Sequence, residues 1–449
     1  MRSLARDVFS IAFVSFAVAC GGDSSGDPDS SLPDGTAGPD GGNTNDGTTN
    51  TDTGTEAGPP TLPATCNGSV ASTSTPATGL PNPPSQLTVV TGFKLEVIAQ
   101  VGTARQLVAL PNGDLLVGTR GSSVYIVPNA EADAVPGKAQ KFATSTDSEA
   151  QGIAYDPATC TIYLATQHGI YKATYKDGDL TGTFGNPIAK VRQGTPTPNS
   201  DGDVHTTTSV AFAGGKVYAG VGSGCNACTE VDPTRSTVQV MGADGSNMTT
   251  KGTRIRNAIA VVANPATGNV WVGGAGQDAL PSGHPFEFFD PVSAHSGTAD
   301  YGWPDCEENH NAFGSGANCT NTVAPAFELP AYSTIVGGAF YPTYTTGSHL
   351  FPSKYVGGLF LTAHGSWHTS GSSYTASPRV VFVPMNGDTP ATPVDWNDPT
   401  KQWSDFVSGW QDPNSQTRHG RPTGVAVGWK GSLFFADDSN GYVYRVRPN

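Results

Sequence analysis

The chain has 449 residues and a formal net charge of −14, from 24 Lys and Arg against 38 Asp and Glu. Its basic residues form no run, which argues against nucleic acid as a partner because that binding requires a clustered basic surface. The high contents of Gly (56) and Pro (35), and the lack of long amphipathic helical patterns, predict a turn-rich all-β protein.

The N-terminus predicts export. Two arginines precede an apolar run at residues 8–19, shorter than the roughly 20 residues that a membrane-spanning helix needs. We therefore predict a removable signal peptide over residues 1–19. Cys20 resembles the lipidated cysteine of a bacterial lipoprotein, and Gly21 behind it favours the outer membrane, on its periplasmic or cell-surface face. The protein would then touch the membrane only through this lipid anchor. An ordinary signal peptide with an incidental cysteine is the alternative.

Residues 20–65 are rich in Gly, Ser, Thr, Pro and Asp, with almost no large apolar side chain. Such a segment buries too little apolar surface to offset its chain entropy. Eight acids and no basic residue lie here, so more than half of the net charge belongs to this segment. We predict a disordered acidic tether that holds a folded domain, residues 66–449, away from the membrane.

Six cysteines remain if Cys20 is lipidated, and an even number in an exported protein indicates disulfides. Two pairs are local in sequence and the remaining two cysteines are left for each other. The expected bridges are Cys225–Cys228, Cys306–Cys319 and Cys66–Cys160. Zinc binding by the Cys-x-x-Cys is the alternative, but no second pair stands at a suitable spacing.

An internal repeat follows the tether. A turn residue, a β-rich apolar run and a small residue recur six times, the first four copies roughly 50 residues apart. The copies occupy residues 113–118, 161–165, 216–220, 269–273, 358–362 and 432–436. This spacing is typical of one four-stranded propeller blade. We predict an all-β, six-bladed β-propeller of antiparallel blades, in which the early strand at residues 93–98 completes the last blade and covers its edge.

The long interval at residues 274–357 is expected to carry excursions from the sheets and to contribute to a site at one end of the channel. Several motifs, in order, resemble the soluble pyrroloquinoline-quinone (PQQ) glucose, sorbosone and pyranose dehydrogenase propellers over nearly the whole domain. They occupy residues 203–205, 222–228, 256–257, 301–304, 364–367 and 420–422. The resemblance implies PQQ- and calcium-dependent oxidation of a sugar or a related polyol or aldehyde outside the cytoplasm.

The resemblance also implies roles for single residues. His205 corresponds to the family's catalytic base, a role that suits an imidazole with a near-neutral pKa. PQQ carries three carboxylates, so Arg and amide donors suit its pocket, and an aromatic face suits its flat rings. The expected cofactor-binding residues are Arg256, Asn257, His364, Trp367 and Arg421. Calcium is expected on the loop after the fourth inner strand, on the carbonyls of Gly276 and Gln277 and on Asp278.

Two features leave the function open. The basic residue that the family shows shortly after the histidine is absent, since residues 206–209 are Thr and Ser. No haem motif is present, because Thr229 follows Cys228, so a dehydrogenase would need a separate electron acceptor, a quinone or a cytochrome. A non-catalytic carbohydrate-binding propeller lipoprotein is the alternative, and a calcium-dependent lactonase is a further one, because propellers host many functions.

Overall fold

A computed structural model describes Cys66 and residues 72–194, 204–281, 283–343, 347–367 and 376–449. The predicted signal peptide, Cys20 and tether lie outside these residues, so their boundaries stay predictions. Within the described part, no helix is long and apolar enough to cross a membrane. The regular structure there consists of β-strands and two short 3-10 helices, η1 (Val292–Ala294) and η2 (Ser353–Tyr355).

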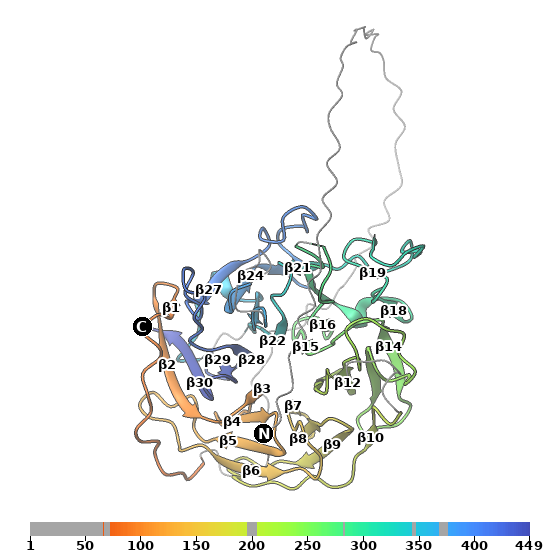
Figure 1. Cartoon of the computed structure of the whole chain (residues 1–449). Coiled ribbons are helices and arrows are strands. Elements are labelled where there is room, and N and C mark those ends of the chain that lie inside the picture. The colour runs from red at the N-terminus through yellow and green to blue at the C-terminus, as the bar shows by residue number, and fades with distance from the viewer. Residues whose placement is uncertain (1–65, 67–71, 195–203, 282, 344–346, 368–375) are drawn as a thin grey trace, which may run out of the picture. The chain divides into compact units, whose positions relative to one another are not determined.

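Six antiparallel blades surround a central channel (Figure 1), which confirms the predicted propeller. Strands are named here from the channel outward. Blade 1 contains β3 (Ala104–Ala109), β4 (Leu115–Thr119), β5 (Ser123–Val127) and β6 (Gln140–Thr144). Blade 2 contains β7 (Gly152–Asp156), β8 (Thr161–Ala165), β9 (Gly169–Thr174) and β10 (Ala189–Lys190). Blade 3 contains β11 (Thr208–Ala213), β12 (Lys216–Val221), β13 (Thr237–Gly242) and β14 (Thr249–Thr253).

The second half of the ring follows the same plan. Blade 4 contains β15 (Ala260–Ala263), β16 (Val270–Gly273), β17 (Glu287–Asp290) and β21 (Phe327–Leu329). Blade 5 contains β22 (Ile335–Phe340), β23 (Leu359–Ala363), β24 (Arg379–Val383) and β27 (Ser404–Ser408). Blade 6 contains β28 (Pro422–Val427), β29 (Leu433–Asp437), β30 (Tyr442–Pro448) and β2 (Phe93–Gln100).

The sequence repeat corresponds to the second strand of every blade. These strands are buried along most of their length, β23 and β29 at every position, because neighbouring blades cover both of their faces. Strands covered on both faces become continuous apolar runs. The second strand therefore carries the clearest signal in the sequence.

Several shorter strands lie at the edges of the blades or outside them. β18 (Ala299–Asp300) and β1 (Thr88–Val89) add a fifth strand to blades 3 and 5. Two small hairpins, β19 (Cys306–Glu307) with β20 (Asn311–Ala312) and β25 (Met385–Asn386) with β26 (Thr389–Pro390), stand outside the blades. Elements β18 to β20 lie in the long interval at residues 274–357, as predicted. The structure also contains the three expected disulfides, Cys66–Cys160, Cys225–Cys228 and Cys306–Cys319.

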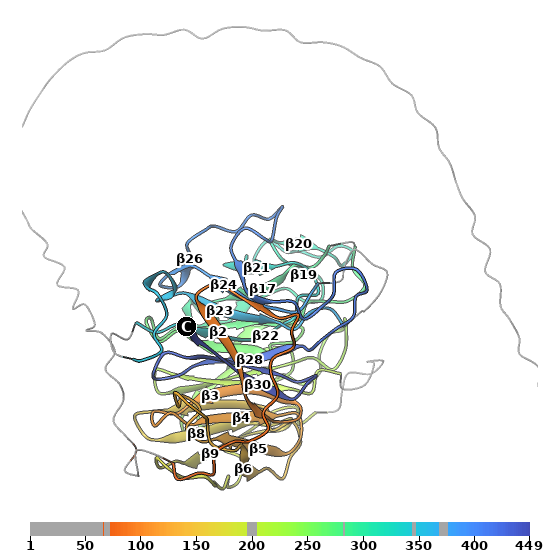
Figure 2. The ribbon, with the colours of Figure 1, turned by 90° about the vertical axis from the view of Figure 1, so that its left-hand side faces the viewer.

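Strand β2 closes the ring by pairing with β30 (Figure 2). It contains residues 93–98, the early strand that was predicted to complete the last blade. Glu96 on β2 accepts hydrogen bonds from Arg445 at 3.0 Å and from Arg447 at 2.9 and 3.1 Å on the neighbouring strand. Val97 is 6% exposed and belongs to an apolar cluster with residues of blades 5 and 6. The contact thus combines backbone pairing, partly buried charge pairs and core packing.

Closure aligns the starts of the inner strands at one end of the channel. The Thr423 hydroxyl, at the start of β28, donates to the Ala104 carbonyl at the start of β3, at 2.9 Å. Likewise, the Gln151 amide before β7 donates to the Thr208 carbonyl on β11, at 2.8 Å. Residues that precede inner strands in different blades are therefore brought together at this end.

Weakening the closing strand should destabilise the whole ring. We expect Val97→Ala to lower the free energy of unfolding by about 2 kcal/mol, because it removes buried methyl groups from the packed cluster. Denaturant unfolding followed by circular dichroism measures this change. Gln100→Ala on the same strand is the matched control, since its side chain is exposed. Equal stability of Val97→Ala and the control would contradict the account.

Candidate active site

A cavity of about 210 Å³ opens at the end of the channel where the inner strands begin. Its wall is formed by His205, Arg256, Ala275, Gly276, Asp278, Glu287, Tyr332, Thr334, His364, Trp367 and Arg421. Seven of these are predicted site residues: the base, both arginines, the His364–Trp367 pair and two of the calcium-loop residues. They come from blades 3 to 6, so the fold brings the separate motifs to one place.

His205 precedes β11 and is partly buried in the wall of the cavity. Its Nδ1 lies 2.8 Å from the Ser223 hydroxyl and 3.1 Å from the Ser223 carbonyl oxygen. The Ser223 hydroxyl donates its own hydrogen to the Cys225 carbonyl at 2.6 Å. Close approach here requires a glycine, because a Cβ on Gly222 would lie 2.7 Å from the His205 Cβ.

These partners determine the tautomer of His205. A carbonyl oxygen only accepts hydrogen bonds, and the single hydroxyl hydrogen of Ser223 is already donated to Cys225. Nδ1 must therefore carry a hydrogen, which leaves the lone pair of the neutral ring on Nε2. The hydrogen-bond partners of Nδ1 thus favour the tautomer that suits a proton acceptor at Nε2.

Arg256 forms the second wall of the cavity. It precedes β15, its side chain is 7% exposed, and its Nη2 donates to the Asp278 carboxylate at 2.7 Å. The other oxygen of Asp278 accepts from the Trp367 indole at 3.2 Å. Trp367 itself is 63% exposed, so the indole presents a large apolar surface to solvent beside the cavity. Asp278 thus holds the arginine and the exposed indole in fixed positions.

Arg421, before β28, uses backbone oxygens rather than a carboxylate. Its Nε donates to the His364 carbonyl at 3.1 Å and its Nη2 to the Gly365 carbonyl at 2.6 Å. Among the described residues it forms no ion pair. Burial lowers its pKa to about 10, so it still carries a positive charge at neutral pH. This guanidinium is the clearest anion-binding group in the cavity.

His364 is hydrogen-bonded through Nε2 to Asp438 at 2.9 Å. Burial lowers the pKa of His364 to about 4, and the nearby Arg421 and Arg105 act in the same direction. Burial alone would raise the pKa of Asp438, but the His364 hydrogen bond and the two arginines lower it to about 2. The pair is therefore a neutral imidazole beside an ionised carboxylate at neutral pH.

Two predicted site residues are buried behind the residues that line the cavity. Asn257 is 7% exposed and its side-chain oxygen is buried without a hydrogen-bond partner, so it is an acceptor that the protein itself does not use. Gln277 is also buried, at 8% exposure, and its side-chain oxygen is likewise without a partner. Neither side chain lines the cavity directly.

The predicted calcium loop requires one correction. Residues 274–278 follow β16, the second strand of blade 4, rather than the inner strand β15, because inner strands begin and second strands end at this mouth of the channel. The loop nevertheless reaches the cavity, with Gly276 and Asp278 in its wall. Glu287, on β17, accepts a hydrogen bond from the Gly276 amide at 2.7 Å, and burial raises its pKa to about 8. Carboxylate, amide and carbonyl oxygens therefore gather here, the donor set that a hard cation takes.

Several residues of the site were missed by sequence reasoning. Arg105, on β3, lies 3.2 Å from the Asp438 carboxylate and is 6% exposed. It supplies basic charge close to the cavity, although no basic residue follows His205. Glu287 and Tyr332 carry no motif at all. Arg105 shares one signal with Arg421, its place at the start of an inner strand, and the blade repeat could have located it on that ground.

Comparison with known proteins supports the resemblance. Residues 294–449 match the family model described as TrAA12-like. The pyranose dehydrogenase PQQ domain from Coprinopsis cinerea is 19% identical, with a TM-score of 0.65 over 82% of this chain and 99% of its own. The calcium structure of a Trichoderma reesei family AA12 carbohydrate-active enzyme is 19% identical, with a TM-score of 0.64 over 83% and 100%. The soluble aldose sugar dehydrogenase from Escherichia coli is 18% identical, with a TM-score of 0.54 over 80% and 100%. The chain thus has the fold of the family that its motifs resemble.

Because burial lowers the pKa of His364, the folding stability of the protein should depend on pH. Its pKa is about 4 in the folded protein and about 6.5 in the unfolded chain, so the unfolded chain binds more protons between these values. Stability should therefore fall as the pH is lowered from about 6.5 to about 4, by roughly 1–3 kcal/mol from this residue.

His364→Gln, which can still donate to Asp438, should remove this part of the pH dependence. Urea unfolding at several pH values measures it, with the half-exposed His168→Gln as the control. If His364→Gln loses as much stability on acidification as the parent protein, the assigned protonation state is wrong.

Proposed function

We propose that this protein oxidises a sugar, or a related polyol or aldehyde, outside the cytoplasm by hydride transfer to PQQ, with calcium as the partner ion and His205 as the base. The observation that carries the proposal is the hydrogen-bond chain from His205 through Ser223 to the Cys225 carbonyl. That chain assigns a hydrogen to Nδ1, so the neutral form of His205 would have its lone pair on Nε2, and the ring lies in the wall of a cavity that also holds two arginines. Oxidation of an alcohol carbon by hydride loss requires removal of the hydroxyl proton, and such a nitrogen can accept it.

The cavity suits a flat, polyanionic cofactor. Arg421 supplies a guanidinium with no carboxylate partner among the described residues, and Arg256 supplies a second one that is oriented by Asp278. The buried, unpartnered oxygen of Asn257 leaves one acceptor available behind them. When bound, PQQ supplies an ortho-quinone that takes up a hydride. The arginines would bind its carboxylates and favour negative charge near its quinone oxygens.

Calcium suits the adjacent loop. Asp278 and the carbonyls of Gly276 and Gln277 would hold the ion, and Glu287 adds a buried carboxylate next to them. Burial raises the pKa of Glu287, and the neighbouring Asp278 adds to the effect, so this carboxyl is not readily ionised without a counter-charge. A divalent cation bound there would supply that counter-charge.

The proposal also includes the cellular location of the enzyme and its electron acceptor. A lipid on Cys20 and the acidic tether would keep the enzyme at the outer membrane, where small sugars reach the open cavity. A separate quinone or cytochrome would take the electrons from the reduced cofactor. The exposed Trp367 indole at the rim offers an apolar face of the kind that sugar rings contact.

The base assignment is tested with His205→Asn, whose amide can still donate to Ser223 but cannot accept a proton. With PQQ, calcium, an aldose panel and an artificial dye acceptor, we expect kcat to fall about 10²- to 10⁴-fold. PQQ affinity should stay within about threefold, because the arginines are untouched.

His310→Asn is the control, since this exposed histidine lies outside the cavity. Dye reduction by His205→Asn at the parental rate would remove His205 as the base. PQQ binding without oxidation of any sugar by the parent protein would favour a propeller that binds carbohydrate without catalysis.

A further inference from the structure

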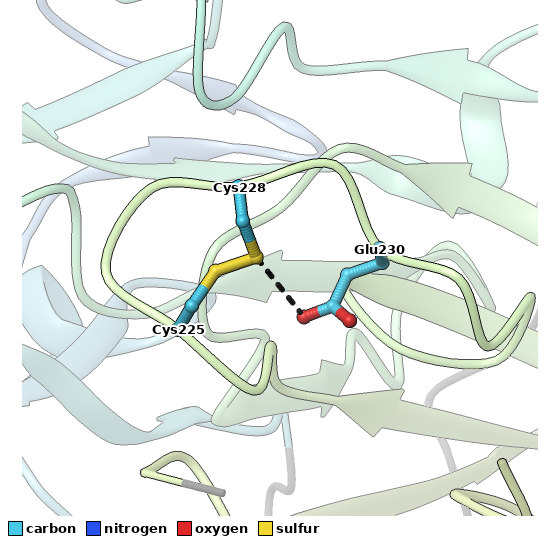
Figure 3. A group of neighbouring side chains, drawn as sticks. All are labelled: Cys225, Cys228 and Glu230. Atoms are coloured by element: carbon cyan, nitrogen blue, oxygen red, sulfur yellow. Dashed lines mark hydrogen bonds between the residues drawn. A yellow bond between two sulfur atoms is a disulfide. The ribbon is translucent and has the colours of Figure 1, made fainter. Parts of the chain in front are cut away.

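The loop Cys225–Cys228 lies beside the cavity and is closed into a small ring by its disulfide (Figure 3). Glu230 lies against it: its Oε1 accepts from the Gly224 amide at 2.5 Å and lies 3.9 Å from the Cys228 sulfur. The two sulfurs and this carboxylate are close enough for a shared metal ion. However, the sulfurs are bonded to each other and offer no thiolate, so the loop serves another purpose.

Asn226, at the tip of this loop, contacts three separate segments. Its backbone carbonyl accepts from Arg256 Nε at 3.2 Å and from the Trp303 indole at 3.0 Å. Its side-chain amide pairs with the backbone of Asp278: the Asp278 amide donates to its Oδ1 at 2.8 Å, and its Nδ2 donates to the Asp278 carbonyl at 3.1 Å. One residue thus joins the start of blade 4, the long excursion and the loop at residues 274–278.

The contacts continue to the groups that face the cavity. Asp278, placed by Asn226, binds Arg256 at 2.7 Å and the Trp367 indole at 3.2 Å. On the other side, the Cys225 carbonyl accepts from Ser223, which in turn orients His205. The arginine, the exposed indole and the base therefore all derive their positions from a four-residue loop whose shape the disulfide restricts.

We propose that Asn226 is a positioning residue, and that the Cys225–Cys228 disulfide braces it so that Arg256, Asp278 and Trp367 keep one arrangement. Asn226 does not touch the reacting atoms. Its effect on cofactor and sugar rests on the proposed function, whereas its effect on the geometry of residues 274–279 does not.

Asn226→Ala in the full chain tests the proposal by hydrogen exchange and mass spectrometry. Protection of residues 274–279 should fall about tenfold, because two hydrogen bonds to Asp278 are lost. The Kd for PQQ should rise about tenfold, while kcat at saturating PQQ changes less than about threefold. A raised Kd with a nearly unchanged kcat would not result from a general loss of folding, which would lower both binding and activity. Asn414→Ala, on an exposed turn, is the matched control.

A second variant covers the case in which Asn226→Ala does not fold. Cys225→Ser/Cys228→Ser opens the loop and keeps Asn226, and it should reduce the protection of residues 274–279 in the same direction. Cys66→Ser/Cys160→Ser removes a disulfide from blade 2 and should leave that segment unchanged. Unchanged protection in both test variants would overturn the proposal. Lost protection in a protein that never binds PQQ would sustain the positioning role and refute the proposed function.

Discussion

The pairing of β2 with β30 is the contact on which the rest of the structure depends. It joins an N-terminal strand to the C-terminal blade and so closes six similar sheets into a ring. In an open array, blades 1 and 6 would be the two ends, and their residues would be far apart. Closure instead places Arg105 of blade 1 beside Asp438 of blade 6, at 3.2 Å. A site assembled from several blades therefore follows from one edge contact.

The electrostatic character of the site comes from burial acting on a few charges. Arg421 remains charged, while His364 and Glu287 are held in their neutral forms at neutral pH. Arg105 and Arg256 are close by, ion-paired with Asp438 and Asp278. The cavity thus combines positive charge with neutral groups that accept protons or hydrogen bonds. Positive charge suits a polycarboxylate, and the Nε2 lone pair of a neutral His205 would suit proton removal from an alcohol. Both properties are required of the same cavity by the proposed reaction.

The sequence predicted the fold well because the second strand of every blade is buried on both faces. That burial produces the apolar runs that repeat along the chain. The early strand at residues 93–98 was predicted as the closing strand for a different reason, because it could complete the last blade and cover its free edge. The site was predicted only in part. His205, Arg256, His364, Trp367 and Arg421 belong to recognisable motifs and do line one cavity.

The remaining parts of the site depend on distances that a sequence does not contain. Asp438 and His364 are 74 positions apart, and Arg105 reaches Asp438 only because the ring closes. Glu287 belongs to the site because it is buried beside the Gly276 amide. The residues around it in the sequence look like those of any other strand. Asn226 was part of a motif, but its pairing with the Asp278 backbone required the structure.

The central claim is that the cavity at the start of the inner strands is a PQQ site, and a titration of the purified protein with PQQ in the presence of calcium tests it most directly. The account predicts that the absorbance of the cofactor changes in a saturable way, with about one equivalent bound and a Kd below about 10 µM. It also predicts that Arg421→Gln weakens this binding, since that guanidinium has no carboxylate partner among the described residues. No saturable binding up to high micromolar PQQ, with or without calcium, would contradict it.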